Sequence, residues 1–209
     1  QAWFLGTEAG NAIASILMGD VNPSGKLPFT FPVSLADVGA HKLGEYPGTP
    51  RNDGSNIVDE KYNESIFVGY RWTDKEKITP LFPFGHGLSY TSYKYGKAVI
   101  DKNIMGDDEV LTVTVPITNI GMRAGSEIVQ MYISDLKSSL PRPVKELKGF
   151  SKVSLEPGET KKVTFTINEE ALSFFDDVRH EWIAEPGIFK AIIAASATDI
   201  RSSVIFEYK

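Results

Sequence analysis

The sequence contains no cysteine, so it can form neither a disulfide nor a thiolate-ligated metal site. Its three histidines, His41, His86 and His180, are far apart, and none lies three or four residues from another, the spacing of a helical pair of metal ligands. No apolar stretch approaches the roughly 20 residues that cross a bilayer. Lysine and arginine are scattered singly in a chain of net charge −5. We therefore expect neither nucleic acid nor a membrane as a partner.

Common catalytic motifs are absent as well. There is no Gly-x-Ser-x-Gly elbow, and Gly85-His86-Gly87 lacks the third glycine, the preceding strand and the following helix of a dinucleotide-binding fingerprint. We interpret it as a tight turn. Among the carboxylates, Asp59, Glu60 and Glu64 form the best candidate for the pair that glycoside hydrolysis needs. The spacing of four between Glu60 and Glu64 is more typical of a solvated face, however, so we predict no catalytic residue there.

What the sequence does contain is typical of a globular protein: 42% hydrophobic and 23% charged residues in 209. The one clear helix runs from about Glu8 to Met18, with Thr7 as the expected N-cap and Gly19 as the residue that ends it. Its apolar residues recur on a single helical face: Ala9, Ala12, Ile13, Ile16 and Leu17. A turn at residues 22–25 leads into an extended run over 27–31, in which Pro28 and Pro32 place the strand at a sheet edge or near its end.

No second helix of comparable quality is predicted before residue 95, so the apolar stripe lacks a packing partner. Leaving two isoleucines and one leucine uncovered forgoes about 1.5–3 kcal/mol each, roughly 5–9 kcal/mol together, as much as many whole domain stabilities. We therefore expect the covering surface to be encoded ahead of Gln1, so that the chain is a fragment of a larger protein.

The middle of the chain is predicted to be irregular. Residues 37–64 are rich in glycine and proline with little periodicity, as in a long loop that serves a site or an interface. Residues 62–95 are dense in aromatic side chains, and we expect most of them to be buried rather than to stack on sugar rings. These aromatic residues are Phe67, Tyr70, Trp72, Phe82, Phe84, Tyr90 and Tyr93.

From Lys97 onward the pattern changes to about seven short alternating runs, the signature of an antiparallel β-sandwich. Turn residues separate the runs at 119–125, 156–159 and 185–187. The predicted runs cover 97–101, 109–118, 127–134, 145–155, 160–167, 178–183 with 188–194, and 204–208.

Taken together, these segments resemble the C-terminal region of glycoside hydrolase family 3, the family of β-glucosidases and related exo-acting enzymes. Four stretches carry the resemblance: Gln1–Trp3 with Gly6–Gly10, Gly19–Pro28, Val68–Arg71 with Pro83–Thr91, and Pro141–Phe150. The resemblance implies a mainly β fold. Residues 1–32 would end an α/β sandwich domain, 33–95 would be a connecting extension, and 96–209 would form a fibronectin type III-like β-sandwich.

The resemblance also implies where catalysis resides. Family members use an Asp nucleophile in a Ser/Thr-Asp-aromatic setting on a preceding barrel, and a Glu acid/base in the α/β sandwich domain. Neither motif occurs here: Ser134-Asp135-Leu136 lacks the aromatic residue, and Glu45 and Glu159 do not match the acid/base setting. No catalytic, cofactor-binding or metal-binding residue is therefore assigned, and no cofactor is expected.

The expected function is thus that of a scaffolding fragment of a retaining β-glycosidase, most similar to the β-glucosidases, and inactive alone. Its expected partners are the upstream barrel and α/β sandwich domains, with a β-glucoside or oligosaccharide as substrate of the whole enzyme. Self-association through the uncovered helix is a further expectation. The family resemblance implies a periplasmic or extracellular location. The alternative is a non-catalytic fibronectin type III-like module that binds carbohydrate or protein.

Overall fold

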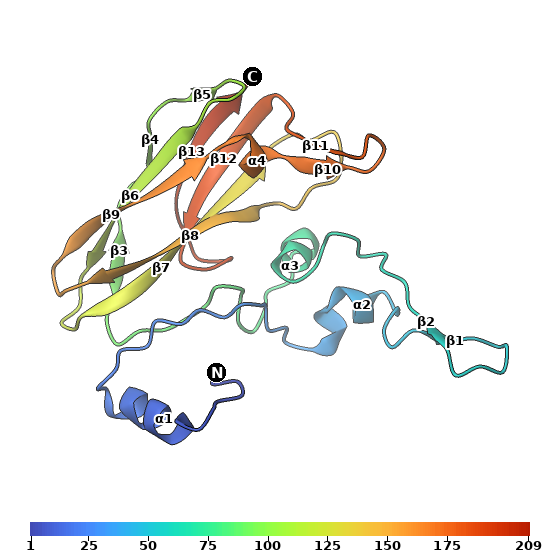
Figure 1. The fold of residues 1–209 in the computed structure, drawn as a ribbon, viewed down its shortest axis with the longest axis horizontal. Helices are drawn as coiled ribbons and strands as arrows, with labels where there is room; N and C mark the ends of the chain where they lie inside the picture. Colours follow the sequence, from blue (N-terminus) through green and yellow to red (C-terminus); the bar gives the residue numbers. More distant parts are fainter.

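The computed structural model describes residues 1–209, and most of its regular structure lies in a β-sandwich. One sheet has the order β5 (Ile104–Met105), β13 (Ile200–Tyr208), β12 (Gly187–Ala194), β7 (Gly125–Asp135) and β8 (Glu146–Leu155). All its pairings are antiparallel except that of β5 with β13. In the second sheet β3 (Tyr93–Tyr95), β4 (Val99–Ile100) and β9 (Thr160–Ile167) each pair antiparallel with β6 (Leu111–Asn119). Figure 1 shows the two sheets packed face to face.

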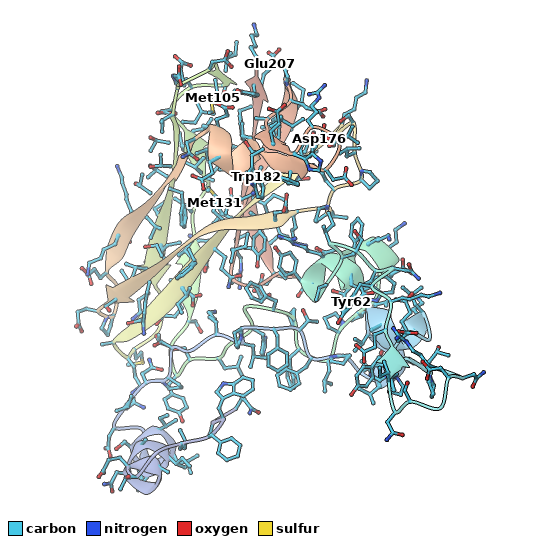
Figure 2. All side chains as sticks on the ribbon, turned by 45° about the vertical axis from the view of Figure 1, so that its right-hand side comes forward. Tyr62, Met105, Met131, Asp176, Trp182 and Glu207 are labelled. Carbon is cyan, nitrogen blue, oxygen red and sulfur yellow. The ribbon has the colours of Figure 1, made fainter.

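The core between the sheets follows from strict alternation along the strands. On β6 every second residue from Leu111 to Ile117 is fully buried, and the threonines between them are only partly covered. The same alternation places Val163, Phe165 and Ile167 of β9 inside. In all, 19 buried residues form one continuous cluster, including Met105 and Met131, which Figure 2 labels within the sandwich. The predicted sandwich is therefore confirmed.

Several details of the sandwich differ from the prediction. The run predicted over 178–183 with 188–194 is two separate units, because β11 (Glu181–Ile183) turns back on β10 (Phe174–Asp176) as a hairpin before β12 begins. A single turn of helix, α4 (Glu169–Leu172), precedes this hairpin and is capped by Asn168. The predicted turns at 119–125, 156–159 and 185–187 do connect consecutive strands.

The predicted N-terminal helix is present as α1 (Ala9–Met18), and Gly19 ends it in the left-handed conformation with φ of 83°. The N-cap is Glu8 rather than Thr7. None of its ten residues is buried, and Leu17 is 75% exposed, so the apolar stripe is uncovered as predicted. Figure 1 shows α1 standing apart from both sheets. No helix of the structure is long and apolar enough to span a membrane.

The strand predicted over 27–31 does not form. Pro28 and Pro32 remove two ladder donors, and only an isolated bridge between Phe31 and Phe82 remains. Residues 35–76 contain short elements that the sequence analysis did not predict: a 3₁₀ turn at Leu35–Asp37, α2 (Gly39–Lys42), a two-stranded hairpin of β1 (Thr49–Pro50) with β2 (Val58–Asp59), and α3 (Tyr70–Glu76).

The prediction that most aromatic side chains of residues 62–95 are buried is wrong. Only Phe67 and Trp72 are buried, whereas Phe82 and Tyr90 are 43% and 45% exposed. Tyr70 and Phe84 are half-buried against the Tyr132 cluster, and Tyr93 is half-buried against the main core.

Candidate functional site

The predicted acidic cluster does not come together as a catalytic pair. Asp59 lies on the exposed β1–β2 hairpin, where the guanidinium of Arg51 holds the pKa of its carboxyl below the usual range. Glu60 is exposed. Glu64 instead is only 8% exposed and lies in a turn, so the predicted solvated face is wrong for this residue. Glu45, also buried, accepts hydrogen bonds from the backbone and side-chain amides of Asn63.

The three histidines lie in three separate settings. His41 packs against the ring of Tyr46, with centroids 5.0 Å apart, and His86 stacks on Phe82 at 5.3 Å. His180 lies in the turn between β10 and β11. The His86 amide donates to Pro83 O across 3.1 Å, so Gly85-His86-Gly87 is part of a tight turn, as predicted. No three histidine, aspartate or glutamate side chains are grouped as metal ligands.

Asn22 joins three segments that are distant in sequence. Its Nδ2 donates to Ala124 O across 2.9 Å, and its Oδ1 accepts from Ser89 Oγ at 2.9 Å and from the Tyr90 amide at 2.8 Å. The Tyr90 hydroxyl in turn donates to Ile16 O at 2.8 Å. The end of α1 is thereby attached to the sandwich while its apolar stripe faces away.

The segment after Asn22 is fixed by contacts with the 83–88 turn. The Leu27 amide donates to His86 O and the Gly85 amide donates to Leu27 O, both across 2.8 Å. A Cβ at Gly87 would collide with the carbonyl oxygen of Gly25, which explains why glycine stands at position 87. Lys26 forms an ion pair of 2.9 Å with Glu127 on the sandwich, and both side chains are largely buried.

A second joint holds α3 against the sandwich. The Leu147 amide donates to Tyr70 Oη across 2.9 Å, and Arg71 forms an ion pair of 3.2 Å with Glu146. Lys145, only 7% exposed, pairs with Asp74 of α3. Figure 1 shows α3 beside the sandwich, between the α2 segment and the sheets.

The base of this joint is Arg142. Its guanidinium donates to Asp135 at 3.3 Å, to Glu146 at 2.9 Å and to the carbonyl of Leu172 at 2.8 Å. Its side chain is 6% exposed, so the ion pairs are shielded from water. The guanidinium carbon also lies 5.2 Å from the ring centroid of Phe174.

These contacts bring the four stretches that carry the family resemblance together in two pairs. Gly19–Pro28 meets Pro83–Thr91 through Asn22 and Leu27, and Val68–Arg71 meets Pro141–Phe150 through Tyr70 and Arg71. The residues that carry the resemblance therefore act as joints between segments. Beside the first joint lies an open groove of about 830 Å3, lined on its apolar side by Trp3, Phe31 and Phe82.

Comparisons with known proteins agree with this arrangement. Residues 1–90 match the glycosyl hydrolase family 3 C-terminal domain, and residues 127–197 match the fibronectin type III-like domain. The chain corresponds to the C-terminal region of glycosyl hydrolase family 3 proteins. It is 53% identical to β-glucosidase BoGH3A of Bacteroides ovatus over its full length and 46% identical to thermostable β-glucosidase B of Acetivibrio thermocellus over 96% of the chain.

The structural likeness to family members is equally extensive. β-Glucosidase 3B of Thermotoga neapolitana, solved with glucose, superimposes on 98% of the chain with a TM-score of 0.86 at 37% identity. The family 3 β-glucosidase of Bifidobacterium adolescentis gives a TM-score of 0.87 at 31% identity. The chain spans only 27% of the Bacteroides relative, 25% of the Acetivibrio relative and 27% of the Thermotoga chain.

The buried carboxylates Glu45 and Glu127 are used in contacts within the chain, the first with Asn63 and the second with Lys26. The sequence pointed to Glu64 but not to its burial, because nothing in its spacing distinguishes a buried turn from an exposed helix face.

Proposed function

We propose that this chain is the C-terminal structural part of a retaining, exo-acting β-glucosidase that releases terminal β-linked sugars. In this proposal the nucleophile and the acid/base belong to polypeptide outside residues 1–209, and the chain alone is inactive. The sandwich and the two joints hold α1 and the 33–92 segment in place against the catalytic part of the enzyme.

The uncovered stripe of α1 is the observation that supports this proposal most. Ile13, Ile16 and Leu17 are 42%, 36% and 75% exposed on a helix that is otherwise anchored at its end by Asn22 and Tyr90. An amphipathic helix keeps its fold mainly by packing its apolar face. The relatives, about four times as long as this chain, contain ample polypeptide to cover it.

The proposal is tested on the full-length protein that contains this chain. We expect it to hydrolyse an aryl β-glucoside and to release the β-anomer of glucose first, as a double-displacement reaction requires. Proton NMR during the first turnovers distinguishes the anomers. Release of the α-anomer, or no hydrolysis of any β-glycoside, would contradict the proposed activity.

The β10–β11 hairpin favours a second candidate function, a carbohydrate- or protein-binding module. Phe175 and Trp182 are cross-strand partners with ring centroids 5.8 Å apart and are 47% and 69% exposed. Exposed aromatic pairs of this kind can bind a sugar face or a protein partner. Figure 2 labels Trp182 and Asp176 on this hairpin.

Calorimetry separates the two functions. If the chain is a binding module, residues 93–209 should bind a β-glucan as tightly as the full chain. In the full chain Trp182→Ala should abolish binding, and Tyr62→Ala, at another exposed ring, is the control. If neither protein shows a heat of binding to the β-glucan, the module function is contradicted and the structural role remains.

A further inference from the structure

A cavity beside α2 and α3 contains two buried polar groups that nothing in the chain satisfies. The cavity has a volume of about 350 Å3 and is lined by Glu64, Thr30, Gly39, Phe67 and Trp72, among others. Glu64 is 8% exposed, and its Oε2 has no hydrogen-bond partner. The buried Oγ1 of Thr30, from a distant segment, has none either. Two polar groups from separate segments thus line one cavity.

The side chain of Glu64 is held in this place by its neighbours. Trp72, which is 4% exposed, is fixed by the hydrogen bond that its Nε1 donates to Asp37 O across 3.0 Å. Gly39 fits between Trp72 and Glu64 so closely that a Cβ there would lie 3.1 Å from the indole and 3.3 Å from Glu64 Cβ. Close packing of this kind keeps the carboxylate from turning out into water.

No cation of this chain reaches Glu64. Lys42 lies 5.8 Å from the Trp72 ring centroid but pairs with Glu76 at 3.0 Å. Lys75 lies over Phe67, 4.1 Å from the ring centroid, and forms no ion pair. An ionised carboxylate buried without a partner costs several kcal/mol, and native proteins pair such groups. A cationic donor from outside this chain would satisfy the unpaired Oε2 of Glu64.

The chemistry of the cavity favours arginine as that donor. A guanidinium has five N–H groups in a planar fork, which can bind a carboxylate with two of them and a hydroxyl with a third. It also packs well against aromatic walls such as those of Trp72 and Phe67. A volume of about 350 Å3 far exceeds the roughly 10–15 Å3 that a single water needs, so a side chain fits.

We propose that Glu64 and Thr30 form a socket for an arginine side chain carried by the polypeptide that precedes residue 1 in the full-length protein. The inference rests on the proposed function, since it requires a larger protein around this chain. It adds a charged anchor beside α2 and α3 to the apolar stripe of α1, and Figure 1 shows α1 well apart from these two helices.

The test compares Glu64→Gln in the full-length protein and in the 209-residue chain by thermal unfolding. In the full-length protein we expect the unfolding midpoint to fall by roughly 2–4 °C or more, because the arginine loses its counter-charge. In the isolated chain the midpoint should stay the same or rise, because the substitution removes an unpaired buried charge. Glu60→Gln, four residues away and exposed, is the matched control and should change neither midpoint.

A fall of equal size in both proteins would place the partner within this chain, and no change in either would mean that only solvent meets Glu64; both outcomes overturn the socket. Thr30→Val provides a second variant that removes the hydroxyl without changing charge, with the same expected contrast. Because the readout is unfolding, a failed socket leaves the activity test of the proposed function untouched.

Discussion

At the scale of single residues, Asn22 illustrates how one side chain, together with Tyr90, attaches the end of α1 to the rest of the chain. Its amide makes three hydrogen bonds of 2.8–2.9 Å to the 89–90 segment and to Ala124. Asn22→Ala leaves these partners unpaired, so we expect a loss of about 1–3 kcal/mol in the free energy of unfolding, measured with urea.

The control for Asn22 is Asn103→Ala, at an exposed position whose side chain makes no hydrogen bond within the chain. Its free energy of unfolding should change by less than about 0.5 kcal/mol. Equal effects of the two substitutions would show that Asn22 is not a joint.

The stability of the folded protein should depend on pH through Tyr208. Burial, and the hydrogen bond that its hydroxyl donates to Asp107 across 3.0 Å, raise the pKa of Tyr208 to about 12. The unfolded state, with an ordinary tyrosine pKa near 10, loses this proton first. The folded protein should therefore lose stability as the pH rises from about 10 to 12.

Urea titrations at a series of pH values measure this effect. Tyr208→Phe should flatten the decline above pH 10, although half-buried Tyr95 and buried Tyr132, whose pKa values are also raised by burial, contribute part of it. Tyr62→Phe, at a residue that is 74% exposed, should leave the slope unchanged. A slope unaltered by Tyr208→Phe would contradict this assignment.

At this scale the sequence predicted a residue's structure correctly where a local steric rule fixes it. It did not predict burial, which depends on contacts with residues far along the chain. Gly19 was predicted to end α1 because a left-handed residue is needed there. Glu64 was predicted to be solvated, since its burial depends on Gly39 and Trp72, which no local spacing reveals.

At the scale of elements, the joint around Arg142 connects β7, β8 and the segment before β10. The guanidinium balances Asp135 and Glu146, whose side chains are 3% and 14% exposed. Arg142→Ala leaves the buried Asp135 without its cation and Glu146 with Arg71 alone, and we expect a loss of about 3–5 kcal/mol in the free energy of unfolding.

Arg142→Lys should also destabilise, since an ammonium cannot form the same planar set of hydrogen bonds. Arg201→Ala removes an exposed ion pair with Asp199 and serves as control, with an expected change below about 1 kcal/mol. If Arg142→Ala lowers the free energy of unfolding in urea no more than Arg201→Ala does, the buried Arg142 joint does not stabilise the protein more than an exposed ion pair.

The stripe of α1 gives a prediction that depends on context. Leu17→Gln should change the stability of the isolated chain by less than about 0.5 kcal/mol, because Leu17 is already 75% exposed. In the full-length protein, where we propose that the leucine is covered, the same substitution should lower the free energy of unfolding by about 1.5–3 kcal/mol.

Asn11→Gln on the same helix is the control in both proteins. Light scattering of the isolated chain adds a further check, since a second copy could cover the stripe and give a dimer that Leu17→Gln would dissociate. A substantial loss of stability in a monomeric isolated chain would show that the helix packs on its own polypeptide.

Among the elements, the long strands were predictable and the short helices were not. The alternation in β6 and β9 is explicit in the sequence. By contrast, α3 has seven residues, including Tyr70, Trp72 and Thr73, which have modest helix propensity. It is held by Tyr70, Trp72 and Asp74 through contacts to residues far along the chain.

At the scale of the whole molecule, the structure combines a sandwich that has its own core with an N-terminal part that has almost none. The sandwich contains the 19-residue cluster, whereas residues 1–92 contribute only Phe67 and Trp72 to the buried apolar residues. The sequence analysis placed the division near residue 95, and β3 (Tyr93–Tyr95) is already an edge strand of the sandwich.

The family could be recognised from sequence because its matched stretches are the joints between segments, where few residue types fit. The identity of the catalytic groups could not, since the proposed enzyme would place them in polypeptide that this sequence does not contain. The socket at Glu64 likewise became apparent only from the burial of an unpaired carboxylate.

The central claim is that residues 1–209 lack a complete glycosidase site, and the most direct test is hydrolysis of an aryl β-glucoside by the purified chain. We predict a rate no higher than that of buffer, with the full-length protein as positive control. Turnover by the chain that is abolished by a single carboxylate substitution, such as Glu45→Gln or Glu64→Gln, would contradict the account.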